Sequence, residues 1–163
     1  MRSYYIVLAL FFALSLSTSA QKSVPKKVVK ADKSTIIQGI CGTVVVKRGN
    51  YMPSPDSPRP NPGGVPAERE VLIFPLLNMG QVDMGDNGFI NSVRDAKPIK
   101  TTRSDKDGKF CVSLPVGRYS VMVRETTGLY ANLSDSQGNI FPVTVPKNRQ
   151  LTVGITISHQ AVF

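Results

Sequence analysis

The chain has 163 residues and a formal net charge of +9, from 20 basic and 11 acidic side chains, with one histidine and two cysteines. This length suits one domain built around one hydrophobic core. One histidine and two cysteines make a poor zinc site and leave no histidine-based catalytic arrangement. The basic residues are not interleaved with aromatic residues, so nucleic acid is not an expected partner.

The first twenty residues have the features of a secretory signal peptide. Arg2 precedes an apolar run from Ile6 to Leu16, and small residues lead up to Ala20. Such a run is too short to span a bilayer, so we expect cleavage after Ala20 and a secreted or periplasmic protein. Residues 21–35 follow with five lysines and no periodicity. They are expected to form a flexible basic arm.

Residues 36–163 are expected to form a single all-β domain. Seven segments alternate apolar and polar residues or form short apolar runs, as strands do: about 37–47, 71–77, 99–104, 110–114, 119–123, 140–145 and 151–158. Asp107-Gly108 favours a tight turn just before the fourth of these strands. Pro115 favours a second turn just after it. Strands without a convincing helix predict a β-sandwich.

Two long connections separate the first three predicted strands. Residues 49–66 contain six prolines, which cannot join the interior of a sheet, so we expect a surface loop. This loop either recognises an extended partner or is only a stiff connection. Residues 78–98 are expected to form the second long loop, since no periodicity indicates a helix there.

The two cysteines are expected to face outward. If Phe110 and Val112 point into the core, Cys111 points away from it, and the inward position of Ile40 does the same for Cys41. A cross-strand disulfide is reasonable if the two strands are neighbours, because an exported protein meets an oxidising environment. A pair of free thiols is the alternative.

Three stretches together resemble the carboxypeptidase regulatory-like domain: Gly42 to Val44, Asp105 to Phe110, and Leu114 to Val123 with its Leu-Pro-x-Gly-x-Tyr pattern. The resemblance covers about residues 36–158. It implies a seven-stranded prealbumin (transthyretin-like, Ig-like) β-sandwich, and a non-catalytic module often found in exported or envelope proteins of bacteria. It also implies that the first and fourth strands are neighbours, which places Cys41 beside Cys111.

The loop at residues 126–139 holds the candidate ligand-binding residues Tyr130, Asn132, Asp135 and Asn139. An aromatic ring beside amides and a carboxylate suits a sugar, because the ring covers C–H groups while the polar groups bond hydroxyls. The alternative is that the Asn and Asp side chains cap turns and that Tyr130 packs over the end of the sandwich.

No cofactor, metal or catalytic residue is expected. Asp105-Lys-Asp107-Gly108 is similar to the opening of a calcium loop, but the later ligands are absent, which favours a hairpin turn. We therefore expect a non-catalytic exported module with a binding or structural role in the cell envelope, where its partner is a protein or polysaccharide. A carbohydrate-binding protein is the first alternative, and a hydrolase using Asp135 is a distant second.

Overall fold

The computed structural model of the chain describes residues 37–53 and 60–163. The predicted signal peptide, the predicted basic arm and part of the proline-rich connection lie outside the described residues. The strands are β1 (Gly39–Asn50), β2 (Val65–Pro66), β3 (Glu70–Pro75), β4 (Val82–Met84), β5 (Phe89–Val93), β6 (Lys100–Arg103), β7 (Lys109–Ser113), β8 (Gly117–Glu125), β9 (Gly128–Tyr130), β10 (Pro142–Val145) and β11 (Gln150–Val162), with a short 3-10 helix, η1 (Met79–Gln81), before β4.

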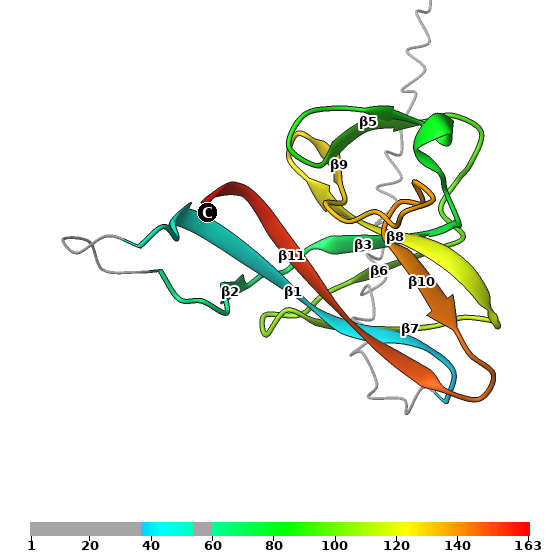
Figure 1. Ribbon diagram of the computed structural model, residues 1–163. Helices are drawn as coiled ribbons and strands as arrows, with labels where there is room; N and C mark the ends of the chain where they lie inside the picture. The colour runs from blue at the N-terminus through cyan, green and yellow to red at the C-terminus, as the bar shows by residue number, and fades with distance from the viewer. Residues whose placement is uncertain (1–36, 54–59) are drawn as a thin grey trace, which may run out of the picture. The chain divides into compact units, whose positions relative to one another are not determined.

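The smaller sheet has four strands and is organised around β1. On one side β1 pairs in parallel with β11, and on the other it pairs antiparallel with β7 and then with β2. The long β1 and β11 run alongside each other in Figure 1. A Cβ on Gly42 would overlap the Val153 carbonyl oxygen of β11, so this position needs a glycine for the close approach of the two backbones.

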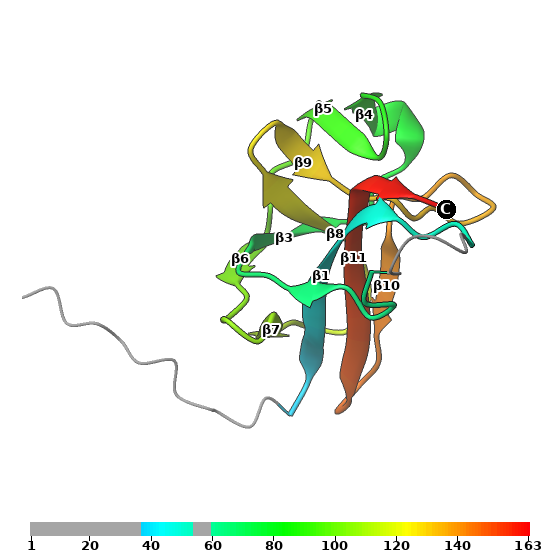
Figure 2. The same cartoon turned by 90° about the vertical axis from the view of Figure 1, so that its left-hand side faces the viewer.

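The larger sheet has seven strands in the order β4, β5, β9, β8, β3, β6, with β10 added beside β8. Its centre is the antiparallel pair β3 and β8, in which Val71 lies opposite Val123 and Ile73 opposite Val121. Figure 2 shows β4, β5 and β9 at the upper end of this view, beyond the part of the sheet formed by β3 and β8.

Side chains from both sheets form one hydrophobic core. Ile40 and Val44 of β1, Val121 of β8 and Ile157 of β11 are all almost completely buried. Burial alternates strictly along β7, as expected for a strand with one face toward the core. The buried Ser120 hydroxyl accepts the Leu77 N–H at 2.9 Å, which satisfies a backbone donor at the edge of this core.

All seven predicted strands are confirmed, and the all-β sandwich prediction with them. The turn at Asp107-Gly108 is also confirmed, since Gly108 has φ of 73°. Asp105 stabilises this turn because its carboxylate accepts the N–H groups of Asp107 at 3.0 Å and Lys109 at 2.8 Å. The carboxylate is therefore engaged as the hairpin interpretation expects.

Residues 78–98 are more ordered than a long loop. They contain η1, which Asn78 caps by accepting the Gly80 N–H, and then the hairpin of β4 and β5. The hairpin turns at Asn87-Gly88, where both residues have positive φ. An Asn-Gly pair favours such a turn, but the flanking strands are too short and too exposed for their sequences to show clear alternation.

Candidate functional site

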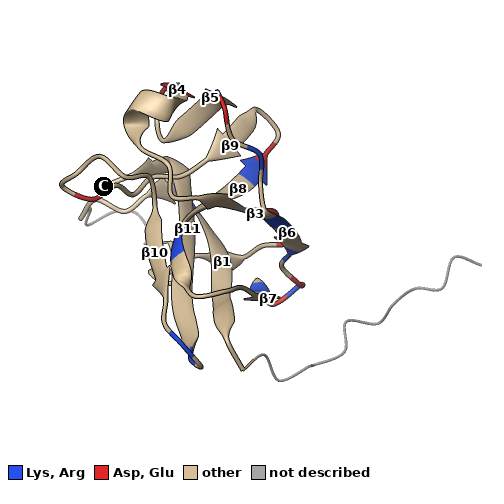
Figure 3. Cartoon of the chain, turned by 90° about the vertical axis from the view of Figure 1, so that its right-hand side faces the viewer, with Lys and Arg blue, Asp and Glu red and all other residues tan. Residues whose placement is uncertain are grey.

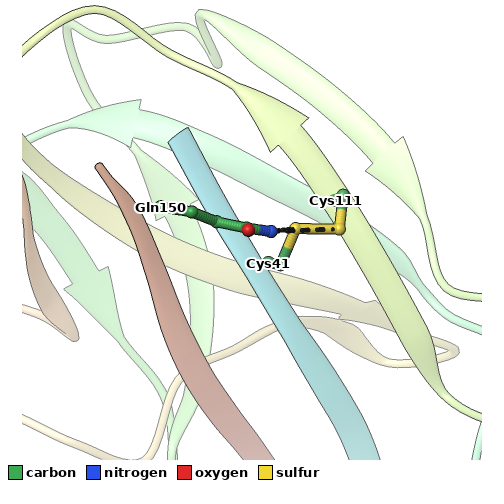
Figure 4. The surroundings of a disulfide bond; sticks show 3 residues. All are labelled: Cys41, Cys111 and Gln150. Atoms are coloured by element: carbon green, nitrogen blue, oxygen red, sulfur yellow. Dashed lines mark hydrogen bonds between the residues drawn. A yellow bond between two sulfur atoms is a disulfide. The ribbon is translucent and has the colours of Figure 1, made fainter. Parts of the chain in front are cut away.

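The disulfide joins directly opposed residues of β1 and β7. Cys41 and Cys111 are partners in the antiparallel register and are bonded through their sulfur atoms, with Cα atoms 4.0 Å apart. Figure 4 shows the bond crossing between the two strands, with the Gln150 amide from β11 donating a hydrogen bond to the Cys41 sulfur. The predicted cross-strand pairing is present, and both side chains lie on the outer face of the sheet, as the strand parity indicated.

The backbone hydrogen bonds explain why this position accepts a disulfide. Val44 N–H donates to the Gly108 carbonyl, and Leu114 N–H donates to the Gln38 carbonyl. Hydrogen-bonded pairs alternate with non-hydrogen-bonded pairs along an antiparallel ladder. Cys41 and Cys111 therefore form a non-hydrogen-bonded pair, the kind that brings opposed Cα atoms closest.

Tyr130 lies inside the protein rather than on its surface. Its side chain is 1% exposed, and its ring packs edge-on against Phe89, with the centroids 5.4 Å apart. The hydroxyl accepts the Ser158 N–H at 3.1 Å, which links β9 to β11. In this conformation the ring of Tyr130 has no free face for a sugar.

Asp135 and Asn139 stabilise the loop that contains them. The Asp135 carboxylate accepts the backbone N–H and the side-chain amide of Asn139, each at 2.8 Å, and the Gln137 N–H at 3.0 Å. The Asn139 side-chain bond, then its backbone bond, hold the pKa of Asp135 below its ordinary value of 3.8; desolvation partly offsets them, and Gln137 and Arg118 add smaller effects. These contacts are those of the turn-capping alternative.

Asn132 is the exposed member of the predicted set. Its side-chain amide donates to the Ser158 hydroxyl at 3.2 Å. It borders a hollow of about 160 Å³ whose rim includes the partly exposed side chains of Met79, Met84 and Leu133. The loop end therefore offers one amide and flexible apolar groups, which suit an apolar surface better than they suit the ring stacking of a sugar.

No pattern in the sequence indicated a buried charged cluster that the structure contains. Glu125, at the end of β8, has a side chain only 8% exposed and forms an ion pair with Arg69. Its second carboxylate oxygen lies 3.8 Å from Nε2 of His159 on β11. Among the described residues, no hydroxyl or thiol is hydrogen-bonded to His159, so the cluster has the carboxylate and imidazole of a proton-transfer pair without an attached nucleophile.

An open charged hollow of about 750 Å³ includes Arg69 and Glu125 of this cluster in its lining. The other lining residues are threonines and further acidic and basic side chains in and next to β3, β6 and β8, and Figure 3 shows both signs of charge near these strands. Arg124 pairs with Glu70, and Arg103 lies 3.9 Å from Glu68. Because the charges are largely paired with each other, the hollow has no strong field of either sign.

A smaller apolar hollow, of about 270 Å³, lies under the end of the proline-rich connection. Its walls include Val46, Tyr51, Pro60 and Val65. Tyr51 stacks on Phe163 with ring centroids 5.3 Å apart, and the ammonium group of Lys47 lies over both rings. This arrangement packs the C-terminal end of β1 against the C-terminal end of β11.

The part of the chain that the structure describes has no group of three or more His, Cys, Asp or Glu side chains placed to hold a metal ion. Nor does it include a helix long and apolar enough to cross a membrane. Compared with known proteins, the chain matches no family model, no curated protein and no solved structure. The resemblance to the carboxypeptidase regulatory-like domain thus stays a prediction.

Proposed function

We propose that the chain is an exported, non-catalytic β-sandwich module with a binding or structural role in the cell envelope. The observation that carries this proposal is the disulfide between Cys41 and Cys111 on the outer face of the smaller sheet. Structural disulfides persist in oxidising compartments outside the cytoplasm. The predicted signal peptide at residues 1–20 points to the same compartment.

The polar groups at the 126–139 loop support a non-catalytic role. Asp135 accepts three hydrogen bonds from its own loop, and Tyr130 uses its hydroxyl to hold β11. A catalytic carboxylate or phenol is usually directed toward a site where a substrate fits. Here both groups are engaged in stabilising the fold.

Carbohydrate binding at the 126–139 end is the alternative function. What favours it is the exposed amide of Asn132 beside a surface hollow. An amide offers both a donor and an acceptor to sugar hydroxyls. Binding to a glycan array that is lost in Asn132→Ala but kept in Thr144→Ala, an exposed strand position, would establish this alternative.

Thiol trapping tests the compartment. The full chain and a variant without residues 1–20 are produced in the same bacterial host, and cells are quenched in acid before free thiols are labelled with a large maleimide. We expect the full chain to be outside the cytoplasm and to label only after reduction, while the shortened variant labels at both cysteines. Free thiols in the exported chain, or a full chain retained in the cytoplasm, would contradict the proposal.

Cross-linking in the intact envelope tests the role. The wild-type chain, the loop variant Asn132→Ala/Leu133→Ala and the control variant Thr101→Ala/Thr144→Ala carry the same affinity tag. A binding or structural module should retain specific protein or polysaccharide partners in the wild type and the control. If the cross-linked chain recovers no specific partner in any of the three, the envelope role is wrong.

A further inference from the structure

The strand β11 has a free edge over part of its length. Within the part of the chain that the structure describes, it lies at the edge of the four-stranded sheet and forms a ladder only with β1. Gly39 N–H donates to the Arg149 carbonyl, so odd-numbered residues from 149 to 157 turn their backbone groups toward β1. Thr152, Gly154 and Thr156 therefore turn theirs away from β1.

Farther along β11, a side chain covers the edge of the strand that faces away from β1. Ser158 N–H, which also faces away from β1, donates to the Tyr130 hydroxyl at 3.1 Å. This bond confirms the parity assigned above and marks where the free edge ends. The open segment of the edge is thus 152–156, where Thr152 and Gly154 are exposed.

The other strands at sheet edges carry features that discourage pairing with a further strand. Proteins protect such edges by keeping them short or by placing charges or prolines in them. The protected edge strands are β2 with Pro66, β4 with Asp83, β6 with Lys100 and Arg103, β7 with Lys109, and β10 with Pro142. By contrast, the 13 residues of β11 include no Lys, Arg, Asp, Glu or Pro.

The sequence of the open segment is symmetric in residue type about Gly154. Thr-Val-Gly-Ile-Thr reads the same in both directions if Val and Ile are treated as one class of β-branched residue. Two antiparallel copies related by a two-fold axis at Gly154 place Thr152 opposite Thr156 on each side of the axis. Opposed threonines are favourable cross-strand pairs, and a two-fold interface requires this kind of self-complementarity.

Charge opposes a second copy less at this edge than elsewhere. The chain has a net charge of +9, which repels a second copy, but the repulsion is weakest where the surfaces that meet carry no basic residues. The open segment is such a surface. We propose that the 152–156 edge of β11 binds the same edge of a second copy of this chain, joining two four-stranded sheets into one continuous sheet.

This proposal does not rest on the envelope role, since it concerns only the chain itself. The oxidised chain is examined by sedimentation over a concentration series that reaches the millimolar range. Because strand addition along one short edge buries little area, we expect a reversible, weak dimer. A chain that stays monomeric throughout the series overturns the proposal.

The variant Thr152→Lys/Thr156→Lys places like charges opposite one another across the proposed axis. We expect it to weaken dimerisation by at least about tenfold. The control Thr101→Lys/Thr144→Lys adds the same charge at exposed positions of β6 and β10 and should weaken it much less. Circular dichroism and an intact disulfide establish that both variants are folded. Equal dimerisation in the two variants would overturn the proposal.

Amide hydrogen exchange gives a residue-level test. In the monomer the outward N–H groups of Thr152, Gly154 and Thr156 should exchange quickly, while those of Val153 and Ile155, which face β1, are protected. At dimerising concentrations we expect protection to rise at the outward positions alone. A dimer that leaves these three amides unprotected uses a different surface and refutes the assignment.

Discussion

Replacing both cysteines by serine removes the covalent link between β1 and β7 with little change in packing, because both side chains lie on the outer face of the sheet. The substitution therefore acts mainly on the unfolded chain, which gains conformational entropy when the link is removed. The disulfide joins residues 70 positions apart. In the chain-entropy model, closing a loop of this length stabilises the folded state by about 4 kcal/mol at 25 °C.

We expect Cys41→Ser/Cys111→Ser to lower the free energy of unfolding by this amount and the melting temperature by about 15 °C. Urea unfolding of the oxidised wild type, the reduced wild type and the double variant measures it, and the last two should agree. The m-value should rise when the link is removed, because the unfolded chain becomes less compact. A loss below about 1 kcal/mol would refute the chain-entropy reasoning for this bond.

Three further changes test the fold. Gly42→Ala should destabilise the chain by at least about 2 kcal/mol, since the new Cβ overlaps a β11 carbonyl oxygen, whereas Gly154→Ala meets no atom and should be nearly neutral in the same urea assay. Ser120→Ala leaves the buried N–H of Leu77 without a partner, so the free energy of unfolding should fall by about 1–3 kcal/mol, and a neutral result would contradict that hydrogen bond. Because the folded pKa of Asp135 is lowered, its contribution is complete above the ordinary value of 3.8 and is lost as the pH falls through the folded pKa; Asp135→Asn should flatten the stability profile in that acid range, and an unchanged profile would exclude the contribution.

The strand positions and the outward direction of both cysteines were predictable because they depend on local alternation. In β7, Phe110 and Val112 are buried while Cys111 between them is exposed, so the pattern in the sequence reports the facing of each residue directly. The same rule placed Cys41 outward on β1. Once the two strands are neighbours, these directions bring the sulfur atoms together.

The contents of the candidate site were less predictable because they depend on which segments meet. Tyr130 stands in a polar loop sequence, but β9 pairs it with Phe89 of β5, and this partner buries the ring. Glu125 and His159 are far apart in sequence and lie on strands of different sheets. No local pattern reports such a contact, since it arises only when the sheets pack.

The pairing of the first strand with the last also determines when the domain can be completed during synthesis. Gly39 of β1 lies beside Gln150 of β11, so this ladder cannot form until residue 150 and those after it have emerged. The β1–β7 pair and its disulfide involve residues no later than Ser113 and can form earlier. One side of β1 therefore stays unfilled until β11 is available, while β7 can already pair with the other side.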